Sequence, residues 1–177
     1  PFDALAETPF PLYLTTDPSD LLAEALARAG RTPEVGMCPW NDDLAYRHKI
    51  ADTPAARPTV AAPFVYHLFG RLRDPESLVL TEDNYLDFLM GITANRTLIP
   101  DFVIGQLAQS ALLFLGFRLD EWEFRVLFRS LMNQEGQERR RRFKHVAVQI
   151  DPEEGRTIEP DRARRYLENY FGENRID

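Results

Sequence analysis

Residues 111–129 read ALLFLGFRLDEWEFRVLFR, and the order of apolar residues in this stretch decides the fold. A continuous apolar run reaches Gly116, and apolar residues then recur at helical spacing. Such a run is typical of a buried strand in a parallel sheet, followed at a glycine by a helix. Ligands bind at strand ends of this kind in open α/β sheets, because the next helix directs its amide dipoles toward them. The stretch therefore predicts an α/β fold with a ligand-binding edge.

The rest of the chain repeats this alternation of short apolar runs and amphipathic helices. The sequence predicts further strands at 12–15, 35–40, 64–69, 77–80 and 146–150, and helices at 18–29, 81–92, 101–109, 120–133 and 160–171. Residues 41–63 are polar, contain three prolines and are predicted to be irregular. This order of elements predicts a Rossmann-like α/β fold, with a largely parallel sheet and helices on both faces.

Two helices carry clear end signals. Asp17 and Pro18 suit the N-cap and first position of one helix, and Gly30 closes it. Thr81 suits the N-cap of the other, whose apolar face consists of Tyr85, Phe88, Leu89 and Ile92.

The composition of the chain limits the classes of protein to which it can belong. The 177 residues suffice for one domain with a sizeable core, and 44% hydrophobic content excludes disorder. A net charge of −7 argues against a nucleic-acid binder that uses its whole surface. The single cysteine excludes a disulfide framework, and the three histidines show no metal-ligand spacing. The sequence shows neither a signal peptide nor a membrane span, so we expect a cytoplasmic protein.

The ends of the chain suggest a fragment. The first residue is Pro1, and the strand at 12–15 is already of the core type. We therefore expect residues 1–177 to form one domain, truncated at both ends, of a larger protein.

Five motifs follow one another along the chain in a fixed order: YLTTDPSDLL at 13–22, VYHLFG at 65–70, SLVLTEDNYLDF at 77–88, FLGFRLDEW at 114–122 and QIDPE at 149–153. Together they resemble the bacterial Sir2-like domains, relatives of the sirtuins that bind and cleave NAD. The resemblance lacks the glycine-rich turn that opens the family pattern and cradles the diphosphate, since Gly30 is the first glycine.

The first motif resembles the segment that holds the ribose of NAD and the attacking water. The resemblance implies that Thr15, Thr16 and Asp20 contact the ligand and that Asp17, which replaces an asparagine, acts in catalysis. A carboxylate only accepts hydrogen bonds, but it can orient water or steady a cationic sugar. On the residues alone, Asp17 is equally explained as an N-cap, and Asp20 as a first-turn acid favoured by the helix dipole.

The second motif resembles the strand end that carries the family's general base. Aligning its glycine with Gly70 puts Phe69 at the position of the base, and His67 two residues earlier on the same side of the strand. The resemblance implies that Gly70 contacts the cofactor and that His67 can take the ribose proton if the strand end shifts. The alternative is a hydrogen-bonded histidine of the core.

The later motifs imply further cofactor contacts at Gly116, Arg118 and Asp151. Arg118 replaces a small hydroxyl residue and can either clamp a phosphate or pair with acids at the helix start. Asp151 lies where a sirtuin strand ends near the adenosine, or simply begins an Asp-Pro turn. The basic run at 139–144 suits nucleic acid or an electrostatic partner, and the acidic composition argues against nucleic acid.

The resemblance implies that NAD or an ADP-ribose-type molecule is the ligand. It further implies that the parent is an oligomeric bacterial protein that senses or hydrolyses NAD in phage defence. The alternative is a catalytically degenerate scaffold or oligomerisation module, because Asp17, Phe69 and Arg118 all depart from the family pattern.

Overall fold

The computed structural model describes residues 2–48, 57–95, 98–116, 125–129 and 146–148. The chain divides into two compact units, residues 1–100 and 101–177, and each unit is described by itself. The single domain expected from the sequence stays a prediction.

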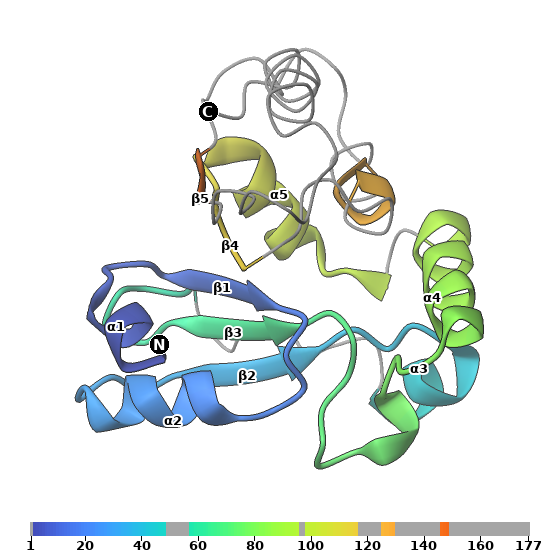
Figure 1. Ribbon diagram of the computed structural model, residues 1–177, viewed down its shortest axis with the longest axis horizontal. Coiled ribbons are helices and arrows are strands. Elements are labelled where there is room, and N and C mark those ends of the chain that lie inside the picture. The colour runs from blue at the N-terminus through green and yellow to red at the C-terminus, as the bar shows by residue number, and fades with distance from the viewer. Residues whose placement is uncertain (1, 49–56, 96–97, 117–124, 130–145, 149–177) are drawn as a thin grey trace, which may run out of the picture. The chain divides into compact units, whose positions relative to one another are not determined.

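The first unit is built on a three-stranded parallel sheet in the order β1-β3-β2 (Figure 1). Its strands are β1 (Leu12–Thr15), β2 (Glu34–Met37) and β3 (Phe64–His67). In the register of the sheet, His67 is paired with Thr15 on one side and with Met37 on the other. The predicted parallel α/β arrangement is confirmed, and His67 ends the central strand.

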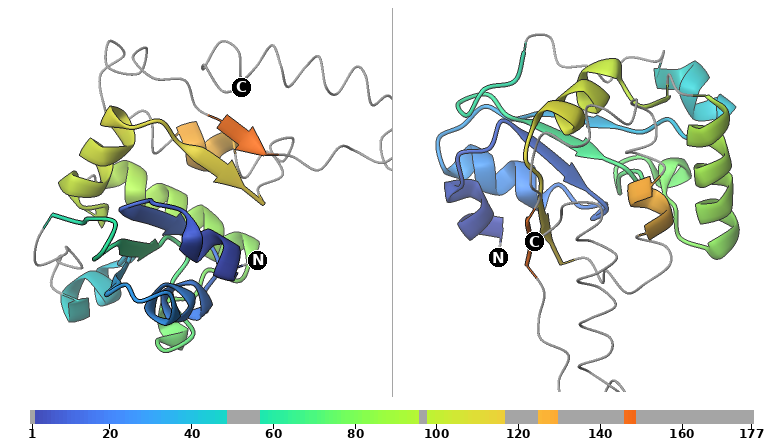
Figure 2. Two further views of the ribbon diagram at one scale, coloured as in Figure 1. Left: turned by 90° about the vertical axis from the view of Figure 1, so that its left-hand side faces the viewer. Right: turned by 90° about the horizontal axis from the view of Figure 1, so that it is seen from above.

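Two helices, α1 (Phe2–Glu7) and α2 (Leu21–Arg28), lie side by side and cover one face of this sheet (Figures 1 and 2). Tyr13 of β1 and Val65 of β3 pack against the apolar face of α2, in which Leu26 is fully buried. The pattern of small and branched apolar residues in α2 thus buries one side of the helix against alternate residues of the strands.

Helix α2 begins later than the sequence predicts. Its N-cap is Asp20, not Asp17, and Pro18 lies outside the helix. The reason is a local turn in which an Asp17 carboxylate oxygen accepts hydrogen bonds from the backbone N–H and hydroxyl of Ser19. Such aspartate turns compete with helix formation. The predicted end is confirmed, because Gly30 adopts a φ of 80° directly after the last turn.

The opposite face of the sheet is contacted by the segment that follows α4 (Glu82–Ala94). The hydroxyl of Tyr66 donates to the carbonyl oxygen of Leu98 at 3.1 Å. The N-cap prediction for Thr81 is confirmed: its side chain accepts from the backbone of Asn84, whose own side chain accepts from the backbone of Thr81. The four residues predicted to form the apolar face of α4, Tyr85, Phe88, Leu89 and Ile92, are all buried.

Two further predictions for the first unit are wrong. Residues 77–80 form no strand; instead the short 3₁₀ helix η1 (Pro75–Ser77) ends there, and Ser77 is fully buried. The Ser77 hydroxyl donates to the carbonyl oxygen of Asp74 at 2.6 Å, and this hydrogen bond holds the chain in a tight turn. The apolar residues of the segment had favoured an extended strand. The segment predicted to be irregular contains helix α3 (Asp42–His48).

The second unit contains α5 (Asp101–Gln109) and two parallel strands, β4 (Leu113–Leu115) and β5 (Val146–Val148). These elements confirm the predicted helix at 101–109 and the parallel pairing of the opening motif. Leu113 and Leu115 nevertheless expose 40% and 38% of their surface, whereas the sequence predicts a buried strand. Residues 125–129 are helical, and Phe128 packs edge-on against Phe114. The predicted helix at 160–171 lies outside the described residues.

Within the described ranges, every helix is too short or too polar to cross a membrane.

Candidate functional site

The first two sequence motifs come together where β1 and β3 end. The backbone N–H of Leu68 donates to the carbonyl oxygen of Thr15 at 2.8 Å, and that of Leu72 donates to Pro18 at 2.9 Å. The turn between β1 and α2, residues 16–20, is therefore held against the segment that follows β3. We call residues 16–20 the β1–α2 turn.

His67 joins the same two segments through its side chain. Its Nδ1 lies 2.9 Å from the carbonyl oxygen of Asp17. Because a carbonyl oxygen only accepts, Nδ1 carries the proton of the neutral ring and Nε2 carries the lone pair. The residue is 1% exposed, and Nε2 has no hydrogen-bond partner among the described residues. The structure thus presents a buried acceptor beside the β1–α2 turn.

The surroundings of His67 keep its ring neutral. Burial lowers the pKa of His67 below its usual 6.5, and the Arg71 guanidinium adds to this effect. The hydrogen bond to Asp17 and the carboxylates of Asp20 and Asp17 oppose it without reversing the direction. A neutral imidazole is the form that accepts a hydrogen bond or a proton at pH 7.

Asp17 holds the β1–α2 turn together and remains exposed. Its backbone N–H donates to the Thr15 hydroxyl at 3.0 Å, while its carboxylate accepts from Ser19. Thr16, between them, is half-buried. The N-cap explanation of Asp17 is wrong, and its exposed carboxylate lies in the turn that His67 contacts.

Asp20 is paired with two arginines that the sequence analysis missed. Its Oδ1 accepts from Arg71 at 2.7 Å, and its Oδ2 lies 2.5 Å from Nε of Arg73. Desolvation raises the pKa of the Asp20 carboxyl, but the two arginines together hold it below the usual 3.8. The only sequence signal was the pair of arginines that flanks Leu72, directly after the HLFG motif.

Gly70 and Phe69 pack against the chain itself. Gly70 has a φ of 81°, and a Cβ at this position would lie 2.1 Å from the carbonyl oxygen of Ser77. The Phe69 ring packs edge-on against Tyr85 and Phe88 of α4, with ring centroids 5.6 Å and 5.2 Å apart. His67 and Phe69 therefore contact different elements, and the prediction that they share one side of the strand fails because β3 ends at His67.

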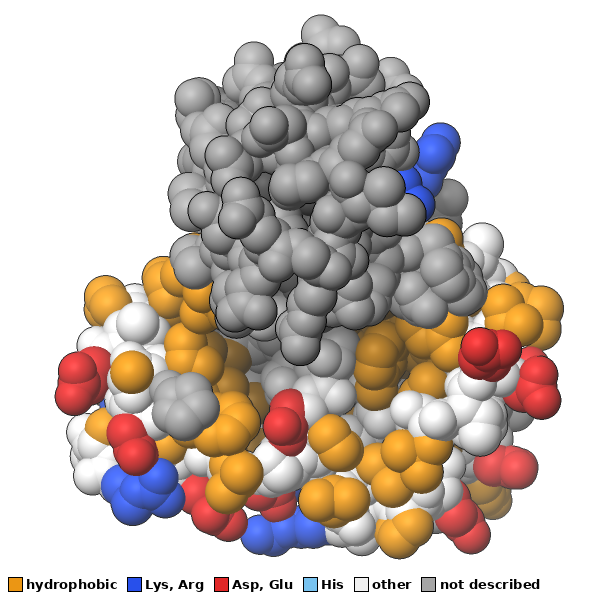
Figure 3. Space-filling model, in the orientation of Figure 1, with side chains coloured by type: hydrophobic (Ala, Val, Ile, Leu, Met, Phe, Trp, Pro, Cys, Tyr) orange, Lys and Arg blue, Asp and Glu red, His pale blue; other side chains and the backbone are white. Residues whose placement is uncertain are grey.

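The remaining predicted site residues belong to the second unit. Gly116 follows β4 with a φ of 74°, and apart from its chain neighbours no described residue has an atom within 4 Å of the position of its missing Cβ. Arg118, Asp151 and the basic run at 139–144 lie outside the described residues. Among the described residues no three histidine, cysteine or acidic side chains gather as a metal site. On the face shown in Figure 3, the described surface mixes acidic and apolar side chains, with basic ones in a few separate places.

A comparison with protein families gives a match over most of the chain. The family model described as a SIR2-like domain matches residues 11–173, which includes all five sequence motifs. A comparison with curated proteins found no significant match. The match spans far more than half of the 177 residues. The chain therefore belongs to the SIR2-like domain family.

Proposed function

We propose that this domain binds NAD or an ADP-ribose-type ligand at the edge where β1 and β3 end. The observation that supports the proposal is the buried Nε2 of His67, which lies beside the β1–α2 turn without a partner among the described residues. A buried acceptor of this kind is costly unless a donor reaches it. Family membership makes a nucleotide ligand the natural source of that donor.

The residues of this edge fit the sugar part of such a ligand. Ribose hydroxyls are donors, and His67 offers a neutral acceptor while Asp17 offers an exposed carboxylate. The same residues do not fit the diphosphate, since Arg71 is engaged by Asp20 and the backbone of Gly70 is covered by Ser77. Within the first unit, the proposed contacts are therefore to the ribose.

If the ligand is hydrolysed, the roles follow from these positions. Asp17 holds water against the anomeric carbon of the nicotinamide ribose, and His67 takes a proton from the same sugar. Loss of a general base typically costs about 10²–10⁴ in rate, so both residues are directly testable. The parent protein would then be a cytoplasmic bacterial defence protein that senses or consumes NAD.

A second candidate is a scaffold that keeps the architecture and lacks the chemistry. The observation that favours it is the packing of Phe69 against Tyr85 and Phe88, because an apolar ring that packs on α4 stands where the family carries its base. Under this proposal, the chain's own side chains fill the strand end, and the surface of the domain forms contacts in an oligomer or with other domains.

One experiment separates the two candidates. The chain is titrated with NAD and with ADP-ribose by calorimetry, and nicotinamide release is followed by chromatography. We expect binding in the micromolar range or tighter, weakened at least tenfold by His67→Asn. Nicotinamide release that Asp17→Ala abolishes would identify hydrolysis. If neither ligand binds, the proposal of a nucleotide site is wrong and the scaffold is the remaining candidate.

A further inference from the structure

Besides the ion pair of Asp20 with Arg73, four contacts fasten the β1–α2 turn and the adjoining end of β1 to the end of β3 and the segment after it. Two are backbone hydrogen bonds, from Leu68 to Thr15 and from Leu72 to Pro18. The third is the ion pair of Asp20 with Arg71, and the fourth is the hydrogen bond from the His67 ring to Asp17. Only the His67 contact involves a group that ordinarily titrates near neutral pH, with a usual pKa of 6.5.

The charges around His67 come from two sides. The β1–α2 turn contributes the carboxylates of Asp17 and Asp20, and the segment after β3 contributes the guanidinium of Arg71. Arg73 reaches the same cluster through Asp20. On the β2 side, the backbone N–H of Cys38 donates to the His67 carbonyl oxygen, and burial raises the pKa of the neutral Cys38 thiol to about 12.

These charges do not provide an acceptor for a second ring proton. Asp20 binds the two arginines and Asp17 binds Ser19, and Nε2 of His67 forms a hydrogen bond with neither carboxylate. A proton on Nε2 would therefore create a buried donor with no partner among the described residues, on a ring that is 1% exposed. Water or a ligand hydroxyl must reach the ring before that donor is satisfied, and either of them reaches it only when the β1–α2 turn moves away.

We propose that His67 is a pH-sensitive latch, whose neutral ring holds the β1–α2 turn against β3 and whose protonation releases the turn. The open form binds a proton with the ordinary affinity of histidine, so acid shifts the population toward it. The latch is a property of the chain without ligand, and it therefore stands or falls independently of NAD binding.

Hydrogen exchange of single backbone amides, measured by NMR on the full chain, tests the latch. The amide of Leu72, bonded to Pro18, reports opening of the turn, and the amide of Leu68, bonded to Thr15, reports opening of the strand end that leads into it. The amide of Phe64, bonded to Pro11 at the other end of the β1–β3 pair, is the internal control. From pH 7.5 to 5.5, after correction for intrinsic exchange, we expect opening at Leu68 and Leu72 to rise by up to about tenfold. The Phe64 amide should change much less.

The matched variant is His67→Asn, which keeps an N–H close to the Nδ1 position and cannot titrate. Its Leu68 and Leu72 amides should lose the acid-dependent rise in opening. An equal rise in the variant, or none in the wild type, would overturn the latch. If the variant does not fold, ¹⁵N spectra of the wild-type ring decide: the latch requires the Nδ1–H tautomer at pH 7.5, and an Nε2–H tautomer would overturn it.

Discussion

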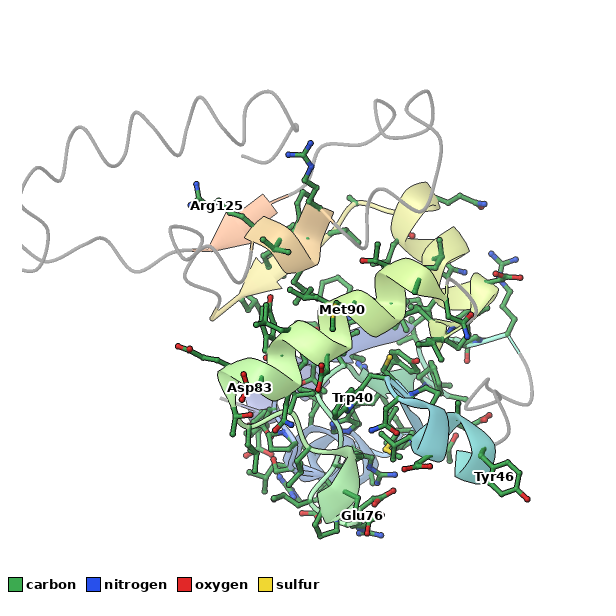
Figure 4. All side chains as sticks on the ribbon, turned by 90° about the vertical axis from the view of Figure 1, so that its right-hand side faces the viewer. Trp40, Tyr46, Glu76, Asp83, Met90 and Arg125 are labelled. Carbon is green, nitrogen blue, oxygen red and sulfur yellow. The ribbon has the colours of Figure 1, made fainter. Side chains whose placement is uncertain are left out.

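The carbonyl oxygen of Ser77 occupies the space that a side chain at Gly70 would need, 2.1 Å from the position of a Cβ. Ser77 is held there from several directions. Its hydroxyl accepts from the backbone N–H of Arg71, and its carbonyl oxygen accepts from the indole of Trp40 at 2.8 Å. Figure 4 shows Trp40 beside α4, on the side toward η1, which carries Glu76. The glycine of the HLFG motif is therefore required by the packing of the chain itself.

Gly70→Ala should destabilise the first unit more than Gly30→Ala. The two glycines have nearly the same φ, 81° and 80°, so alanine suffers the same backbone strain of about 1–2 kcal/mol at each. Of these two glycines, Gly70 alone has an atom of a described residue other than its chain neighbours within 4 Å of the missing Cβ. We expect a loss of about 3 kcal/mol or more in the free energy of unfolding for Gly70→Ala. Urea denaturation measures both variants, and equal losses would contradict the steric argument.

Arg71→Ala should cost more stability than Arg73→Ala, although both side chains bind Asp20. The Arg71 side chain is 21% exposed and donates through two nitrogens to Oδ1, whereas the Arg73 side chain is 75% exposed. Hydrogen bonds to a partly buried charge contribute about 1.5–3 kcal/mol, and exposed pairs typically contribute less than 1 kcal/mol. Chemical denaturation at pH 7 measures the difference. A larger loss for Arg73→Ala would mean that the Asp20 pair is arranged differently in solution.

The Asp20 carboxyl should also contribute to the acid sensitivity of the fold. Its pKa in the folded chain lies below the usual 3.8, so the unfolded chain binds the proton more readily. The stability that Asp20 contributes is therefore fully present above pH 3.8 and is lost as the pH falls below that value. The free energy of unfolding of Asp20→Asn, measured from pH 5 to 3, should fall less steeply than that of the wild type. Parallel curves would contradict the linkage.

Local patterns predicted the three strands and the helices α2 and α4 of the first unit, but they did not predict α1, α3, η1 or the pairing of residues distant in the sequence. The apolar run of β3 and the Thr81 cap of α4 are determined by neighbouring residues, so both were predicted from the sequence. The pair of Asp20 with Arg71 spans 51 residues and leaves no periodic signal. The turn at Ser77 was not predicted for the opposite reason. The apolar residues after Ser77 favoured a strand, whereas its hydroxyl forms a local hydrogen bond with the backbone.

The candidate site likewise combines features that the sequence predicted with features that it did not. The motif order brought Asp17 and His67 into one prediction, and the structure places them in contact. That contact runs through the backbone carbonyl of Asp17, which side-chain chemistry cannot reveal. The direction of Phe69 was equally hidden, because the alternation rule for strands assumes that β3 continues past His67.

Phe69→His should not create an NAD-cleaving site. The family pattern puts a base at this position, but the Phe69 ring packs against Tyr85 and Phe88 rather than reaching the β1–α2 turn. A polar ring in an aromatic cluster should lower the free energy of unfolding by about 1–3 kcal/mol. Phe69→Leu is the matched apolar control and should cost less. Nicotinamide release by Phe69→His above that of the wild type would show that the side chain can turn into the site.

The Cys38 thiol should be unreactive in the folded chain. It is fully buried, its Sγ lies 3.8 Å from the Leu98 carbonyl oxygen, and burial raises its pKa from 9.0 to about 12, with a small opposing effect from Tyr66. Because the thiolate is the nucleophile, alkylation at pH 8 should be at least about 10³-fold slower than in denaturant. Mass spectrometry after iodoacetamide treatment measures the rate. An Ala94→Cys variant adds an exposed thiol on α4 that should label quickly in the same sample.

The raised thiol pKa also fixes the direction of an alkaline effect. The folded chain resists ionisation of Cys38, so the stability that the neutral thiol contributes is fully present below pH 9.0 and is lost as the pH rises toward about 12. Cys38→Ala, which cannot ionise, should therefore lose less stability than the wild type between pH 9 and 10.5 in urea denaturation. Fast labelling of Cys38 at pH 8 in native buffer would contradict both expectations, because it would place the thiol in contact with solvent.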